Sequence, residues 1–247
     1  MAARKLSSSS SSAGGATMKP LTNLISIKQQ QGLSIVELMV TLVLSLFIVL
    51  ITTGFYVNNK STYRYIDSSE EVQENGRYAI HFLRETIANA GFPKVDLSII
   101  AFSTVPTNDS GPNNSDQISV SYQATQNCLG ANIAGPITST FAIVGTNLSC
   151  NGTALIAGVE NLQLEYGVDN DGDEIPNTYQ TADAVTDFNQ VVAVRLAVLI
   201  SSQNQVRDQA SAETYQLLGV SYTAPNDRLH RRVFTTTIPL RNNNKDT

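Results

Sequence analysis

The stretch that decides the fold is Gly32-Leu33-Ser34-Ile35-Val36-Glu37, followed by the uncharged run LMVTLVLSLFIVLITTGFYVNN at residues 38–59. About 20 mainly apolar residues suffice for a helix to cross the hydrocarbon core of a bilayer. The alternative is a helix buried in a soluble core, but such helices seldom stay apolar on every face over this length. The sequence therefore predicts a membrane-spanning helix.

The charges before the run predict its orientation. Four basic residues and no acidic residue precede Glu37: Arg4, Lys5, Lys19 and Lys28. By the positive-inside rule, the N-terminal flank stays cytoplasmic and the chain after the run is exported. A cleaved secretory signal is not expected, because the apolar run is too long and no small-residue cleavage site follows it.

Glu37 needs an explanation of its own, because an acidic residue at the centre of a membrane helix costs about 2.5–3.5 kcal/mol. A glycine, a glutamate five residues later and an apolar run together resemble the class III signal of type IV prepilins. In that family a membrane peptidase cleaves after the glycine and methylates the new N-terminal amine. The resemblance implies cleavage between Gly32 and Leu33 and N-methylation of Leu33, although the family usually has Phe at that position.

The same resemblance implies a role for the carboxylate in assembly. In a filament of packed helices, Glu37 would form an ion pair with the terminal amine of Leu33 on a neighbouring subunit. The alternative is that Glu37 merely lies near the lipid headgroups.

After Tyr56 the pattern changes from apolar on all faces to apolar on one face. Apolar and small residues recur at helical spacing, with charged residues between them: Val72, Ala79, Phe82, Leu83, Thr86, Ile87 and Ala90. Gly91 and Pro93 are typical of the end of a helix. The pattern predicts that this part of the helix packs against a soluble head.

The remainder of the chain is strand-like. Alternating or continuous apolar residues predict strands near 118–122, 162–168, 191–200, 217–222 and 232–240, with 191–200 buried on both faces. We therefore expect an α+β fold, in which a long N-terminal helix packs on one face of a small antiparallel β-sheet head, as in type IV pilins.

Four regions follow from these patterns together with the resemblance to prepilins, which implies the leader and the filament-core role. They are a leader at 1–32, a membrane-spanning and filament-core helix at 33–59, an amphipathic second half of the helix at 60–91, and a β-rich periplasmic head at 92–247. Translation starts either at Met1 or at Met18, so that residues 1–17 are not translated in the second case.

Three further segments resemble minor pilins of the PilW type. They are VQENGRYAIHFLR at 72–84 with the nearby ANAGF at 88–92, VAVRLAVL at 192–199, and RRVFTTTIPLRN at 231–242. A type II secretion pseudopilin of the J type shares the N-terminal features and is the alternative.

Cys128 and Cys150 both follow the membrane segment, which places them in an oxidising compartment. We expect them to form a disulfide rather than to remain free thiols.

Asp169, Asp171 and Asp173 place carboxylates at alternate positions of a segment that contains Gly172, an arrangement that offers oxygen ligands to Ca²⁺. The EF-hand pattern fails, because its sixth and twelfth positions are Glu174 and Gln180. The alternative is a polar turn, in which Asp, Asn and Gly are the usual residues. No other cofactor is expected.

Composition argues against an enzyme and against nucleic-acid binding. The chain has two histidines and no tryptophan, and it contains no nucleotide-binding glycine loop, zinc spacing or nucleophile elbow. Its net charge is −5, from 16 basic and 21 acidic residues, which disfavours DNA binding. We interpret a C-terminal basic group as ordinary surface charge, with neighbouring strand residues on opposite faces: Arg228, His230, Arg231, Arg232 and Arg241.

Together the resemblances imply a minor type IV pilin that prepilin peptidase processes and that helps to initiate or cap pilus assembly, for twitching, adhesion or DNA uptake. The implied partners are other major and minor pilins, the peptidase, the inner membrane and the pilus assembly machinery. The protein would span the inner membrane once, with a periplasmic head, before assembly into an extracellular pilus. Two alternatives are the J-type pseudopilin and a membrane-tethered binding module or adhesin.

Overall fold

The computed structural model describes residues 32, 34–93, 99–102 and 114–243. The chain divides into two compact units, residues 1–52 and 53–247, and each is described by itself. One long helix, α1 (Ile35–Ala88), supplies the described secondary structure of the first unit and continues into the second. All described β-strands belong to the second unit.

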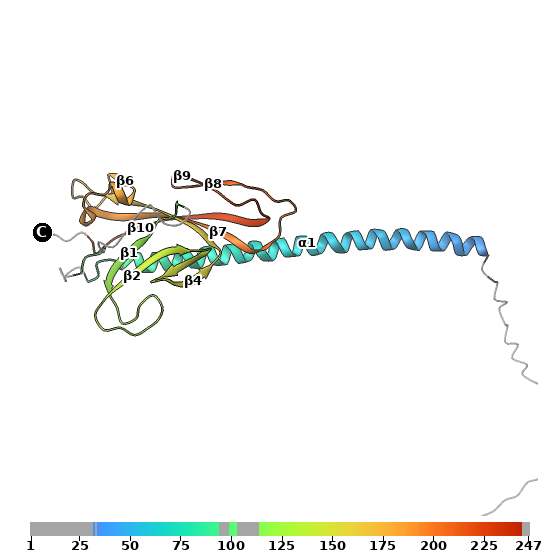
Figure 1. The fold of residues 1–247 in the computed structure, drawn as a ribbon, viewed down its shortest axis with the longest axis horizontal. Helices are drawn as coiled ribbons and strands as arrows, with labels where there is room; N and C mark the ends of the chain where they lie inside the picture. The colour runs from blue at the N-terminus through green and yellow to red at the C-terminus, as the bar shows by residue number, and fades with distance from the viewer. Residues whose placement is uncertain (1–31, 33, 94–98, 103–113, 244–247) are drawn as a thin grey trace, which may run out of the picture. The chain divides into compact units, whose positions relative to one another are not determined.

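The first sheet is a four-stranded antiparallel meander (Figure 1). Its strands are β1 (Ile118–Gln123), β2 (Pro136–Val144), β3 (Asn147–Cys150) and β4 (Thr153–Ala157), in that order. In β2 every second residue faces inward, as Phe141 and Ile143 do. The turn between β3 and β4 is Asn151-Gly152, with positive φ at both residues, which is the pair that a two-residue hairpin favours.

The second sheet contains the longest strands. It consists of β5 (Val159–Val168), β6 (Thr178–Gln180), β7 (Val191–Gln205) and β10 (Leu229–Pro239), in the order β10-β7-β5-β6. Two short 3-10 helices, η2 (Ala182–Ala184) and η3 (Phe188–Gln190), connect β6 to β7. The central position of β7 explains its nearly continuous apolar sequence, because both of its faces are covered.

A third, two-stranded sheet is formed by β8 (Thr214–Leu217) and β9 (Val220–Thr223). Leu217 packs with Ala197 and Leu199 of β7 in a small separate cluster. The β8–β9 hairpin therefore covers one face of β7, while alternate residues of the same strand, such as Val198, face the main core.

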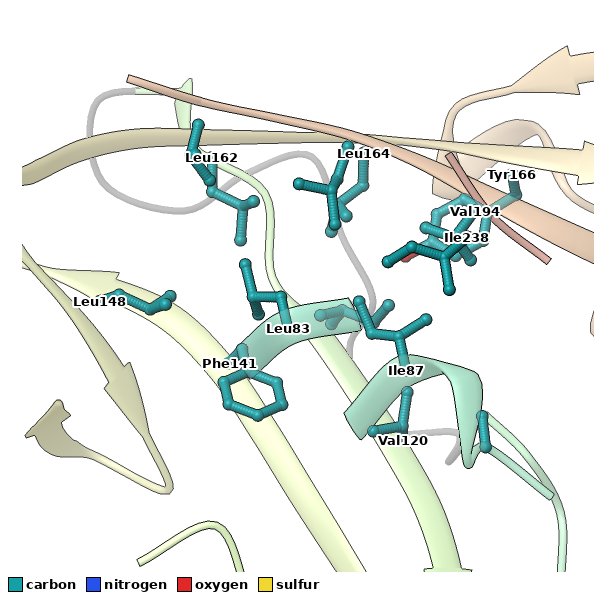
Figure 2. Close-up of a cluster of buried hydrophobic side chains, with 14 of the residues drawn as sticks. Leu83, Ile87, Val120, Phe141, Leu148, Leu162, Leu164, Tyr166, Val194 and Ile238 are labelled. Atoms are coloured by element: carbon teal, nitrogen blue, oxygen red, sulfur yellow. The ribbon is translucent and has the colours of Figure 1, made fainter. Parts of the chain in front are cut away.

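The main core lies where α1 meets both four-stranded sheets. Figure 2 shows Leu83 and Ile87 of α1 between side chains of the first sheet, such as Phe141, and side chains of the second, such as Leu164 and Val194. All of these side chains are at most 2% exposed. A helix with one apolar face thus joins two sheets that each have an apolar inner face.

Helix α1 ends where the sequence predicts a stop. Gly91 has a φ of +78°, and a Cβ there would lie 2.7 Å from the backbone oxygen of Asn242. Its N–H donates to the backbone oxygen of Ser121 at 2.8 Å. Glycine is therefore required both by the left-handed conformation and by the close approach of the C-terminal segment.

The α+β class and the long helix are confirmed, but two details of the predicted head are wrong. The described part of the head has two four-stranded sheets and a hairpin rather than one small sheet, because residues 136–157 form the three unpredicted strands β2, β3 and β4 beside β1. Residues 217–222 are not one strand, since Leu218 and Gly219 adopt positive φ and turn the chain between β8 and β9.

Candidate functional site

The N-terminal half of α1 exposes an apolar surface. Every large apolar side chain between Ile35 and Val57 is from 50% to 79% exposed. In length and composition α1 is the one helix of the described chain suited to crossing a membrane. Exposed apolar patches of this extent mark surfaces that lipid or other proteins cover.

Glu37 lies in the first turn of α1 and is exposed. The first described helical hydrogen bond is close by, from the N–H of Leu38 to the oxygen of Ser34 at 3.1 Å. A helix N-terminus favours a carboxylate, because its unpaired N–H groups carry partial positive charge. Leu33 lies outside the described residues, so cleavage after Gly32, methylation of Leu33 and the intersubunit ion pair stay predictions.

The second half of α1 is held by one narrow face. The predicted residues Val72, Ala79, Leu83 and Ile87 are fully buried. Phe82 is half-buried, and its ring meets the edge of Phe141 with centroids 5.9 Å apart. The charged side chains of the opposite face, such as Arg77 and Arg84, are exposed.

Gly76 makes a close contact with Phe234 that the sequence did not predict. It is buried in the middle of α1, and a Cβ at this position would overlap the ring of Phe234 on β10. The glycine lets the ring lie directly against the helix backbone. A glycine in the interior of an otherwise regular helix was the available signal, because it costs about 1 kcal/mol relative to alanine and so needs a packing reason.

Cys128 and Cys150 form the expected disulfide, with Cα atoms 6.4 Å apart. It ties the loop between β1 and β2 to the end of β3. Within that loop the side-chain oxygen of Asn127 accepts hydrogen bonds from the N–H groups of Leu129 and Ala131. The loop is therefore an organised surface, and it exposes the apolar side chain of Leu129.

The acidic loop brings Asp169, Asp171 and Asp173 together, with one ligand oxygen of each within 4.8 Å of the others. The Asp169 carboxylate already accepts N–H bonds from Asp171, Gly172 and Glu174 at 2.8–3.1 Å. Burial raises the pKa of Asp169, but these hydrogen bonds outweigh it and leave the pKa below its ordinary value. The loop is thus a polar turn built on one carboxylate, and calcium binding stays a prediction.

Arg231 contradicts the interpretation of the C-terminal basic group as surface charge. Its side chain is 1% exposed, with bonds of 2.8 and 3.0 Å to Glu160 and of 2.6 and 2.7 Å to Asp227. Arg232 on the opposite face is exposed, so the expected alternation holds. The buried face of β10 carries a planar cation because β5 and the turn before β10 supply two carboxylates for it.

A second polar cluster lies beside the β8–β9 hairpin. Arg207 forms an ion pair with Glu213, which also accepts a hydrogen bond of 2.7 Å from the hydroxyl of Tyr215. Burial, and then the bond to Glu213, raise the pKa of Tyr215 to about 12. The hairpin is therefore anchored by apolar contacts on one side and by ionic contacts at its base.

An open groove lies between α1 and the segment that follows β7. Its α1 side includes Lys60, Ser61 and Arg64, and its other side includes Val206 and Arg207. We call it the α1–β7 groove. Sequence reasoning did not predict it, because residues 60 and 207 are far apart in the chain.

A helix with an exposed apolar half, continuing into a half that packs against antiparallel sheets, defines a type IV pilin-like protein. Residues 120–242 match the family model described as Type IV Pilus-assembly protein W, so most of the head is similar to that family. The match runs from within β1 to beyond β10 and includes two of the segments that resemble PilW-type minor pilins, residues 192–199 and 231–242.

Two other comparisons complete the picture. Among solved structures, a type IV-like pilin from Thermus thermophilus is similar, with 14% identity, a TM-score of 0.48, and coverage of 72% of this chain and 97% of that chain. No curated protein matches the sequence.

Proposed function

We propose that this protein is a minor type IV pilin, made as a prepilin and held in the inner membrane by the first half of α1. The exposed apolar surface of that half carries the proposal, because a helix of this kind needs lipid before assembly and other helices after it. The four basic residues before the run support a cytoplasmic leader and a periplasmic head.

The PilW-like head gives the proposal its narrower form. The match of residues 120–242 to a pilus-assembly family supports a role in initiating or capping the pilus. The partners are then other pilins, which pack against the apolar half of α1. The protein acts by packing and by one ion pair at Glu37, and prepilin peptidase supplies the covalent chemistry.

N-terminal sequencing of the protein isolated from pili and from membranes tests the processing step. We expect a chain that begins at methylated Leu33 in cells with the peptidase and an intact leader in cells without it. A leader that stays attached in assembled material would contradict the proposal.

A further inference from the structure

We propose that the α1–β7 groove binds the headgroup of an anionic phospholipid and so fixes the base of the head against the membrane before assembly. The inference rests on the membrane placement of α1 proposed above. It adds a ligand, a diacyl phospholipid with a negatively charged phosphate, at a site apart from the helix-packing surface.

The groove has the shape of a cleft with cationic walls. Helix α1 contributes Lys60 and Arg64, one turn apart on the same face, and the opposite wall contributes Arg207. Arg228 closes the same side, while the acidic residues at the groove are Asp67 and Asp208. The groove is therefore cationic in a chain whose net charge is −5.

The two α1 cations are available to a ligand. Arg207 is engaged by Glu213, and Arg228 donates to the side-chain oxygen of Gln205 at 3.2 Å. Lys60 and Arg64 are exposed, and neither has an ion pair with any residue of the described ranges. A lipid phosphate would supply the missing negative charge, and Arg64 offers the planar donor geometry that phosphate oxygens accept.

The position along α1 selects lipid as the occupant. Lys60 is the first charged residue after Glu37, and residues 38–59 are about the length needed to cross the hydrocarbon core. Lys60 therefore falls at the level of the headgroups. Tyr56 and Tyr63 lie two turns apart and are 67% and 73% exposed, as expected of aromatic side chains at a membrane interface.

The competing occupant is an acidic segment of a neighbouring subunit. Beyond Asp67, which lies at the groove, the next exposed acids of α1 are Glu70 and Glu74, and a second copy would bring its own. We favour lipid because Lys60 and Arg64 adjoin the membrane-spanning run directly, whereas a neighbour would meet them only in the filament.

The test uses the full chain, purified in a mild detergent and mixed with equal amounts of phosphatidylglycerol and phosphatidylcholine. Native mass spectrometry then counts the retained lipid. We expect the wild type to retain phosphatidylglycerol preferentially. Lys60→Gln with Arg64→Gln should lower that preference about 25-fold, since each basic residue contributes about a fivefold effect at an anionic surface and the two effects multiply. Arg77→Gln with Arg84→Gln makes the same charge change on exposed parts of α1 and should leave the preference unchanged.

Two further measurements separate the explanations. Carbonate extraction of membranes tests whether α1 is still inserted in both double variants, and we expect both to resist extraction. A loss of insertion would count against the proposed function rather than against lipid binding in the groove. An equal preference in wild type and groove variant, displacement of the lipid by millimolar inorganic phosphate, or a retained second copy in place of lipid would each overturn the lipid proposal.

Discussion

At Gly76 the ring of Phe234 lies where a side chain would otherwise be. In an exposed helix interior, Gly→Ala stabilises by about 1 kcal/mol. Here we expect Gly76→Ala to lower the free energy of unfolding by about 1–3 kcal/mol, because the new methyl group displaces a packed ring. Chemical unfolding of the full chain in detergent, followed by circular dichroism, measures the change.

The control for this prediction is a double-mutant cycle. With Phe234→Ala in the background, Gly76→Ala should become stabilising, because the ring is gone and only helix propensity remains. A stabilising effect of Gly76→Ala in both backgrounds would show that the ring moves aside without cost.

The ion pairs of Arg231 give the protein an acid sensitivity with a defined sign. Hydrogen bonds from Arg231 lower the pKa of Asp227 below its ordinary value, outweighing the opposite effect of burial. A carboxylate whose pKa is lowered in the folded state stabilises that state at pH values above its pKa in the unfolded chain, about 3.9. That contribution is lost as the pH falls through the lower folded-state pKa.

We therefore expect Asp227→Asn to lower the free energy of unfolding at pH 7. The difference in unfolding free energy between wild type and variant should become smaller below about pH 4. Unfolding free energies of the full chain in detergent, measured across this range, give the two curves. Asp183→Asn removes an exposed carboxylate on η2 and serves as the control. Parallel curves for wild type and Asp227→Asn at all pH values would exclude the linkage.

At the scale of single residues, the sequence predicted what depends on local pattern. The buried stripe at Val72, Ala79 and Leu83 follows from helical spacing, and the disulfide follows from two cysteines in an oxidising compartment. Burial of Arg231 does not follow from a local pattern. Strand alternation predicts which residues share a face, but it does not predict that the carboxylates of Glu160 and Asp227 lie on that face.

The disulfide acts on whole elements, because it fixes the loop between β1 and β2 to the end of β3. Its cysteines are 22 residues apart, and a cross-link closing a loop of this length stabilises by about 3 kcal/mol in the chain-entropy model. We expect Cys128→Ser with Cys150→Ser to lower the unfolding free energy by about that amount. Wild type measured in reductant is the matched control.

Two outcomes would contradict this prediction. Equal unfolding of oxidised wild type and double variant would mean that the cross-link adds no stability. Labelling of free thiols in the denatured, unreduced wild type would mean that the bond does not form in cells.

For whole strands, prediction from the sequence missed β2, β3 and β4, of which only β3 and β4 are short. The Asn151-Gly152 pair was a usable hairpin signal, and Ile137, Phe141 and Ile143 alternate. The surrounding Ser, Thr and Gly residues hid that alternation, because the inward position between Ile137 and Phe141 is Ser139. The hairpin at Leu218-Gly219 was missed because its two strands together have the length of one ordinary strand.

The whole molecule combines two surfaces with different requirements. The first half of α1 needs an apolar environment, while the second half and the sheets form a head with its own core. A long apolar run therefore suffices to predict the first from sequence, whereas the pairing of strands far apart in the chain does not follow from any local pattern. The α1–β7 groove exists only because β7 ends beside α1. It could therefore be identified only from the structure.

The last prediction concerns Glu37, which belongs to the whole assembly because its proposed partner lies on another subunit. Removing one partner of a buried ion pair costs about 3–5 kcal/mol, so Glu37→Ala should reduce incorporation into pili about a hundredfold or more. Glu70→Ala removes an exposed acid later in the same helix and should assemble normally. Immunoblots of sheared pili, normalised to the amount in membranes, measure the incorporation of each variant relative to wild type. If Glu37→Ala is incorporated as well as wild type, the intersubunit ion pair is excluded, and Glu37 of the wild type has only a headgroup contact.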